Sequence, residues 1–147
     1  MKNLYFKAIL LCLCLFASIN AFAYDAEIDG IYYNFISENE AEVTYQKYII
    51  GDEYPFYSNY SGSISIPQTI TYNGKSYSVT SIGNYAFRSC TSLTDVYCHA
   101  TTPPGATSSS FDTSYIKTNT TLHVPSGSIT SYKAADYWKS FKSIVAL

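Results

Sequence analysis

Hydrophobic and polar positions alternate along most of the chain, with the period of two that is typical of β-strands. Short runs rich in aromatic and β-branched residues recur, and polar or glycine-containing segments separate them. The runs at 30–37 and 42–46 are divided by polar residues and predict a hairpin. Further runs predict strands near 63–66, 69–73 and 76–80. The pattern therefore predicts a mostly β fold.

The dipeptide Asn73-Gly74 separates the last two of these strands. A type I′ turn needs two positive φ angles, which asparagine and glycine adopt more readily than other residues. We therefore expect a tight hairpin at this point.

One segment near the C-terminus has the period of a helix instead. Its apolar residues recur every three positions and form one stripe: Ile129, Tyr132, Ala135 and Trp138. Ser126 and Ser128 offer side-chain oxygens that could cap the first turn. The pattern predicts a capping helix within 126–147.

The N-terminal segment has the features of an export signal. Lys2 and Lys7 precede an apolar run at 8–19, and Ala21-Phe22-Ala23 fits an A-x-A cleavage site. The apolar run is too short to cross a bilayer, which takes about 20 residues. We therefore predict a signal peptide at 1–23, a secreted, periplasmic or cell-surface protein, and no membrane span in the mature chain.

Charge and size narrow the classes of partner. Residues 24–147 carry seven basic and eleven acidic side chains, and eight of the acidic ones precede residue 54. Without a basic stripe, the chain is a poor match for nucleic acid. The length is that of one domain.

A strand pattern recurs in the second half of the chain. The segments 64–66, 96–98 and 122–124 each place two inward residues around an outward one. Phe87 and Phe111 precede the second and third of these segments, 24 residues apart. A period in the low twenties is typical of leucine-rich solenoids, in which each unit buries its apolar face against the next.

The segment IGNYAFRSCTSLTDV, residues 82–96, resembles the repeat of the BspA-like leucine-rich repeat family, which reads roughly I-G-x-x-A-F-x-x-C-x-x-L-x-x-V. Seven positions match: Ile82, Gly83, Ala86, Phe87, Cys90, Leu93 and Val96. The flanking segments are similar to that family's lead-in and closing segment, so the resemblance covers nearly the whole mature chain.

This resemblance implies a short leucine-rich-repeat solenoid with an N-terminal β-hairpin lead-in and a C-terminal capping helix. We expect the lead-in at 24–76, a repeat core at 77–125 with one good and one degenerate copy, and the helical cap at 126–147. The expected repeat core consists of Ile82, Ala86, Phe87, Cys90, Leu93, Val96, Cys98, Leu122 and Val124.

The two cysteines of the mature chain, Cys90 and Cys98, are interpreted as structural. In the repeat pattern, Cys90 is expected to be a buried thiol that caps backbone carbonyls. A catalytic thiol would need a nearby cation or helix N-terminus, and His99 follows Cys98 in a strand, so their side chains face opposite ways. A disulfide between the two cysteines stays open as an alternative.

Two sequence patterns partly resemble metal-binding sites. The acidic segment 25–30 begins like a calcium loop, but Ile36 stands where the bidentate glutamate is required. His99 and His123 could meet on neighbouring strands, but no third ligand accompanies them. The chain also lacks the G-x-S-x-G and H-E-x-x-H motifs. We therefore predict no enzyme, no metal and no cofactor.

The leading functional hypothesis is a non-catalytic exported module that binds or adheres to an extracellular protein or glycan at the cell surface. A tentative ligand-binding face follows from the outward positions of the predicted strands: Ser65, Tyr97, His99 and His123. The alternative is a structural or remnant repeat unit with no ligand of its own.

The leader prediction is tested by the mass of the mature protein. We expect intact-mass measurement of secreted, periplasmic and membrane fractions to show a chain that begins at Tyr24. A full-length cytosolic species, or a lipidated cysteine, would contradict it.

Overall fold

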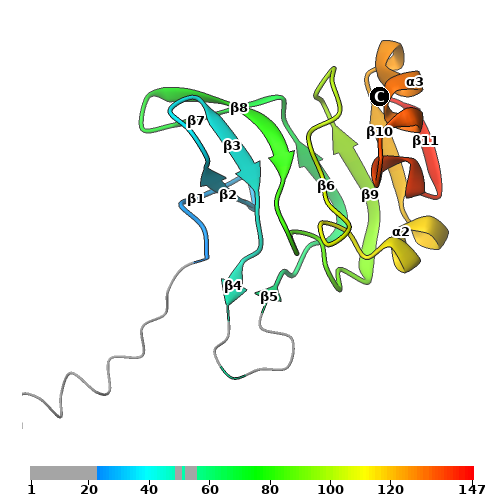
Figure 1. Cartoon of the computed structure of the whole chain (residues 1–147), viewed down its shortest axis with the longest axis horizontal. Helices are drawn as coiled ribbons and strands as arrows, with labels where there is room; N and C mark the ends of the chain where they lie inside the picture. The colour runs from blue at the N-terminus through cyan, green and yellow to red at the C-terminus, as the bar shows by residue number, and fades with distance from the viewer. Residues whose placement is uncertain (1–22, 49–50, 52–55) are drawn as a thin grey trace, which may run out of the picture.

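The computed structural model describes residues 23–48, 51 and 56–147, and strands dominate this part of the chain. Two main sheets lie side by side, with the helices at the C-terminal end of the molecule (Figure 1). The first sheet has five strands in the order β1-β2-β3-β8-β7. Their bounds are Ala26–Ile28, Ile31–Phe35, Glu40–Val43, Lys75–Ile82 and Thr69–Tyr72, in that order.

The second sheet has four strands in the order β11-β10-β9-β6, and all neighbours in it are parallel. Their bounds are Ser143–Ala146, Thr121–Val124, Ser92–Cys98 and Ser61–Ile66. A short ribbon pairs β4 (Lys47–Tyr48) with β5 (Phe56–Tyr57). The helical segments are α2 (Thr113–Asn119), η1 (Ser126–Ser128), α3 (Ile129–Ala134) and η2 (Trp138–Ser140). Within the described residues, no helix is long and apolar enough to span a bilayer.

The predicted hairpins are confirmed. Strands β2 and β3 pair antiparallel, as do β7 and β8. Asn73 and Gly74 join β7 to β8 with φ angles of 50° and 77°, the two positive values that a type I′ turn requires. Asp29 and Gly30 make an equivalent turn between β1 and β2, with φ angles of 50° and 77°.

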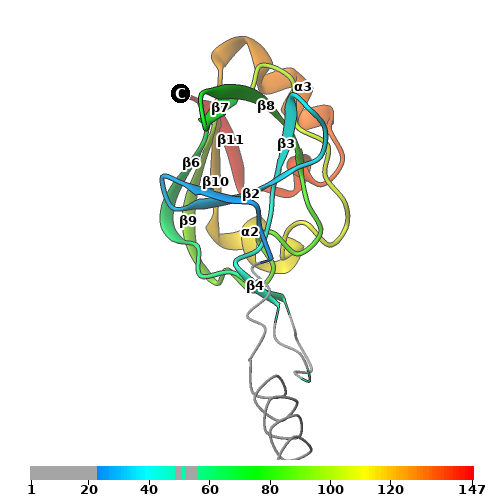
Figure 2. The same ribbon diagram turned by 90° about the vertical axis from the view of Figure 1, so that its left-hand side faces the viewer.

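The predicted solenoid between two caps is wrong. In the first sheet, β3 pairs parallel with β8, whereas every other pair is antiparallel. Strand β8 continues through Ile82, so residues assigned to the lead-in and to the repeat core belong to one mixed sheet. Viewed along the long axis, strands of both sheets surround the interior (Figure 2). A mixed sheet and an all-parallel sheet therefore replace a row of equivalent units, and of the predicted fold class only the mostly β character agrees with the structure.

The expected C-terminal helix is also shorter than predicted. Helix α3 ends at Ala134, and Ala135 has the extended angles φ −73° and ψ 132°. Tyr137 has a φ of 67°, after which the indole Nε1 of Trp138 donates to the carbonyl oxygen of Pro104 at 2.7 Å. The last residues then form β11 beside β10. Burial of the tryptophan ring and strand pairing thus outweigh the helical spacing of the apolar residues.

Ser128 also differs from its expected role as a helix cap. Its side chain makes no cap hydrogen bond to α3, and its hydroxyl instead donates to the carbonyl oxygen of Thr101 at 2.7 Å. The serine therefore ties the start of the C-terminal segment to the loop that follows β9.

The interior is a single apolar cluster that contains every residue expected in the repeat core. Phe87 and Phe111 stack with ring centroids 5.5 Å apart and an angle of 8°. Phe111 also contacts Trp138 edge-on at 5.1 Å, and Phe87 contacts Tyr60 at 5.0 Å. This chain of rings joins the segment before β6, the two inter-strand loops and the C-terminal segment.

Phe87→Ala should be strongly destabilising, because the ring is 1% exposed and packs between two other rings. We expect a loss of about 3–5 kcal/mol in the free energy of unfolding. Urea melts against a Leu147→Ala control, whose side chain is 51% exposed, measure the difference. Equal midpoints for the two variants would contradict the central position of Phe87.

Candidate binding face

The four residues predicted to form a ligand-binding face lie together on the outward side of the parallel sheet. Ser65 pairs with Tyr97 across β6 and β9, and Tyr97 pairs with His123 across β9 and β10. Ser65 and His99 are exposed, and the other two are partly exposed. The alternation of the strands buries their neighbours, so the predicted register is confirmed. On the buried side, the same register forms two rows of core residues. The first row is Ile64, Val96 and Leu122, and the second is Ile66, Cys98 and Val124.

Tyr97 and His123 form a stacked pair at the centre of this face. Their ring centroids are 4.2 Å apart and the rings are within 11° of parallel. Parallel strands in register place the two side chains directly beside each other, which brings the rings face to face. The pair presents a flat surface of one phenol and one imidazole.

Asp95 is hydrogen-bonded to the imidazole of His123. The Nε2 atom of His123 lies 2.9 Å from Oδ1 of Asp95. The hydrogen bonds from His123 and then from Thr94 hold the pKa of the Asp95 carboxyl below its usual range. An ionised carboxylate only accepts hydrogen bonds, so Nε2 of His123 is the donor. The face thus contains one fixed negative charge at neutral pH.

Asp95 was not among the predicted face residues. The repeat pattern puts two residues between the inward positions Leu93 and Val96, and a simple alternation does not say which of them faces outward. The structure has an irregularity at this point, after which Asp95 pairs with Ser63. An inward spacing of three in a strand is the signal for such a bulge.

A second outward row contains hydroxyl groups and lies one step earlier along the strands. Asp95 is flanked in it by Ser63 on β6 and Thr121 on β10, and Thr121 pairs with Ser143 on β11. The hydroxyl of Ser143 donates to Oγ1 of Thr121 at 3.2 Å. The outward face is therefore polar beside the stacked rings.

The two histidines have separate partners. His99 Nε2 lies 3.1 Å from the hydroxyl of Ser65, whereas His123 is bonded to Asp95. In the described part of the chain, no three side chains of metal-binding type cluster together. The acidic turn of Asp29 and Gly30 is a hairpin between β1 and β2.

Cys98 and Cys90 are both free and buried, so the disulfide alternative is wrong. The Cys90 thiol donates to the carbonyl oxygens of Ser58 and Arg88 at 3.7 and 3.8 Å. This is the predicted capping of backbone carbonyls. Burial raises the pKa of the Cys90 thiol to about 11, so the group is neutral and a poor nucleophile at neutral pH.

Cys98 is held by a tyrosine of helix α3. Its sulfur lies 3.1 Å from the hydroxyl of Tyr132, which donates to the carbonyl oxygen of Ala100 at 2.9 Å. Because the tyrosine proton is used there, the thiol is the donor to the tyrosine oxygen. Burial raises the pKa of both groups. The hydrogen bond between Cys98 and Tyr132 thus connects helix α3 to the end of β9.

Alkylation measures how reactive the thiols of Cys90 and Cys98 are in the native and the unfolded protein. With a pKa of about 11, only about one Cys90 in a thousand is a thiolate at pH 8, against a usual pKa near 8.5 for an unfolded thiol. We expect iodoacetamide to label neither cysteine of the native protein at that pH, and both after unfolding in urea without reductant. Rapid labelling of the native protein would contradict this environment.

The cysteine thiols of the unfolded chain also ionise at a lower pH than the buried Cys90 thiol. The free energy of unfolding should therefore fall as the pH rises from about 8.5 to 11.

No family model, no curated protein and no solved structure matches this chain. The resemblance of residues 82–96 to the BspA-like repeat therefore stays a prediction from the sequence.

Proposed function

We propose that this chain is an exported, non-catalytic binding module that holds an extracellular protein or glycan on the outward face of its parallel sheet. The binding face consists of Ser65, Asp95, Tyr97, His99 and His123. The observation that carries the proposal is the stacked Tyr97–His123 pair, fixed from one side by Asp95.

Pre-organisation is the first argument for this face. Association costs free energy for every flexible side chain that it immobilises. Tyr97 has few torsions, and its stack against His123 already restricts them. The hydrogen bond to Asp95 restricts the imidazole in turn. A partner that packs on these rings would therefore meet a surface that is largely ordered before binding.

Chemical variety is the second argument. A tyrosine ring offers apolar area together with one hydroxyl, a combination that is frequent in binding surfaces. The hydroxyls of Ser63 and Thr121 lie in the adjacent row and can exchange hydrogen bonds with peptide groups or sugar hydroxyls. Val145 continues the row of Tyr97 and His123 onto β11 and is 38% exposed. The face thus combines apolar, polar and charged contacts.

Asp95 and the two buried thiols are poorly suited to catalysis. A general base works best when its pKa lies near the working pH. The pKa of the Asp95 carboxyl is instead lowered by its bond to His123. The thiols of Cys90 and Cys98 are buried, and burial raises the pKa of each. These groups suit the maintenance of a surface rather than a reaction.

Tyr97→Ala and His123→Ala should weaken partner binding by about tenfold each, because each removes half of the stacked pair. The partner is first identified with a glycan array and by capture of extracellular proteins on the immobilised protein, and its affinity is then measured by titration. Asp95→Asn keeps the side-chain size and removes the charge, so it should reduce binding less. Tyr48→Ala truncates an exposed tyrosine on β4 and is the matched control.

Thermal melts of each variant accompany the titrations. Unchanged affinity with an unchanged melt in both Tyr97→Ala and His123→Ala would contradict the assignment of this face. A protein that retains no partner in either screen would favour the alternative, a structural unit without a ligand.

A further inference from the structure

The parallel sheet ends at an open edge. Strand β11 pairs with β10 on one side, and within the described residues no strand follows it on the other. The backbone N–H of Leu147 donates to the carbonyl oxygen of Val124 on β10 at 2.9 Å. Because successive N–H groups of a strand point to opposite sides, those of Ile144 and Ala146 point to the open side. An edge of this kind is a template for a further strand.

Exposed apolar side chains accompany this edge. Val145 is 38% exposed and Leu147 is 51% exposed, and the two lie on the same side of the extended chain. They are two of the four large apolar side chains that are exposed in the described part of the protein. Cross-strand neighbours on an added strand would cover part of both.

Basic side chains lie near the same edge. Lys142 immediately precedes β11, Lys133 is on helix α3, which packs against β11, and both lysines are exposed. Neither ammonium group has a hydrogen bond or an ion pair with another described residue, whereas Lys139 pairs with Asp136 at 2.7 Å. The surroundings of β11 therefore attract an acidic partner.

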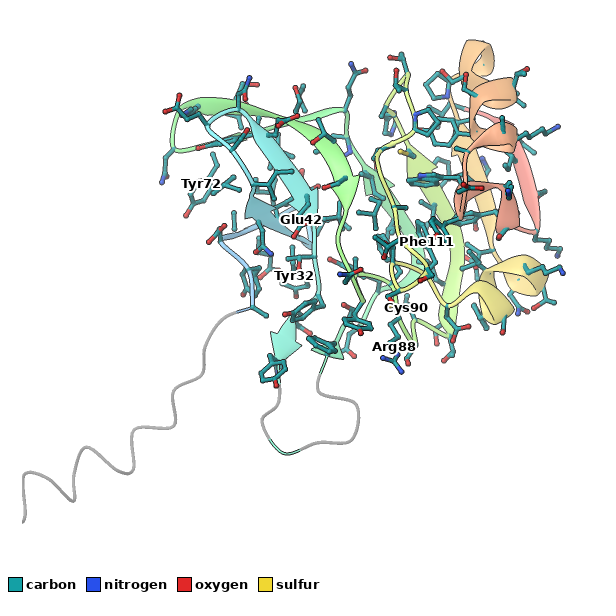
Figure 3. The ribbon with its side chains drawn as sticks, in the orientation of Figure 1. Tyr32, Glu42, Tyr72, Arg88, Cys90 and Phe111 are labelled. Carbon is teal, nitrogen blue, oxygen red and sulfur yellow. The ribbon has the colours of Figure 1, made fainter. Side chains whose placement is uncertain are left out.

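An acidic open edge lies at the other end of the molecule. Strand β1 is the outermost strand of the five-stranded sheet, and among the described strands it pairs with β2 alone. It contains Glu27, and Asp25 and Asp29 flank it; all three side chains are exposed. Figures 1 and 3 show the β1–β2 end, where Tyr32 is labelled, on the opposite side of the molecule from helix α3 and β11.

Glu27 provides backbone groups as well as a charge at this second edge. The two-residue turn that follows β1 makes Ile28 and Ile31 a hydrogen-bonded pair, so the next pair, Glu27 and Tyr32, is not hydrogen-bonded. The N–H and C=O groups of Glu27 therefore point away from β2. Its carboxylate has no hydrogen bond or ion pair with another described residue.

We propose that copies of this chain associate head to tail, with β11 of one copy beside β1 of the next. Main-chain hydrogen bonds join the two edges, and Lys142 of one copy meets Glu27 of the next. A contact between two different surfaces does not close after two copies, so the product is an open chain of molecules. The contact uses none of the five residues of the binding face and does not depend on the function proposed for it.

Charge selects this pairing over the other edges. Two β11 strands facing each other would bring two copies of Lys142 together, which is repulsive. The opposite edge of the five-stranded sheet is β7, and Lys75 pairs with Tyr72 at its end. The acidic β1 is therefore a better partner for β11 than either β7 or a second β11.

Analytical ultracentrifugation of the mature protein at low salt measures this association. A contact between two short edges is small and therefore weak. We expect the weight-average mass to rise from that of a monomer at about 10 μM to more than that of a dimer at about 1 mM. Sodium chloride at about 1 M shortens the Debye length to about 3 Å, so it should reduce the rise.

Exchange of charges locates the contact. Lys142→Glu and Glu27→Lys should each weaken association at least about tenfold, because each places like charges opposite one another. The double variant restores a pair of opposite sign and should associate again, as should an equimolar mixture of the two single variants. Lys75→Glu makes the same change of net charge as Lys142→Glu at an exposed site outside β1 and β11, and it is the matched control.

Ala146→Pro tests the strand pairing itself. The substitution removes an N–H group on the open side of β11, where an edge strand tolerates proline. We expect a melting temperature close to that of the wild type, together with association weakened by about tenfold.

Three outcomes would overturn the proposal. They are a constant monomer mass up to about 1 mM at low salt, association that stops at a dimer, and a charge-exchanged double variant that associates no better than the single variants. Equal weakening by Lys75→Glu and Lys142→Glu would overturn it as well. Tyr97→Ala should associate normally, so a failure of the binding face would not be mistaken for a failure of this contact.

Discussion

Parallel pairing in register places Ile64, Val96, Leu122 and Ile144 in one row across four strands. Because side chains alternate along a strand, a slip of one residue in any of these strands would exchange its buried and exposed sides. The same register therefore decides what lies inside and what lies outside. It packs the apolar row into the core, and it also stacks Tyr97 on His123 and brings Asp95 within reach of the imidazole.

Small polar side chains also form hydrogen bonds to backbone carbonyls inside the core. The hydroxyl of Thr120 is fully buried and donates to the carbonyl oxygen of Leu93 at 2.8 Å, while the hydroxyl of Ser110 donates to the carbonyl oxygen of Ile82 at the same distance. Each pair joins segments 27 or 28 residues apart. Side-chain hydroxyls thus satisfy backbone carbonyls inside the core.

Local patterns were enough to predict the β class, the Asn73-Gly74 turn and the outward position of Tyr97, because each depends on neighbours in sequence. The two-sheet arrangement depends on the parallel pairing of β3 with β8, which no local pattern records, and the repeat resemblance favoured equivalent units instead. The end of α3 depends on the distant hydrogen bond of Trp138. Asp95 was missed at a bulge.

The two neutral thiols bear on how the chain folds. Neither Cys90 nor Cys98 forms a bridge, and each instead serves as a hydrogen-bond donor inside the core. Among the residues that the structure describes, the core is therefore assembled without an oxidation step. The hydrogen bonds of Cys90 and Cys98 require reduced thiols, so this part of the core is compatible with a reducing compartment.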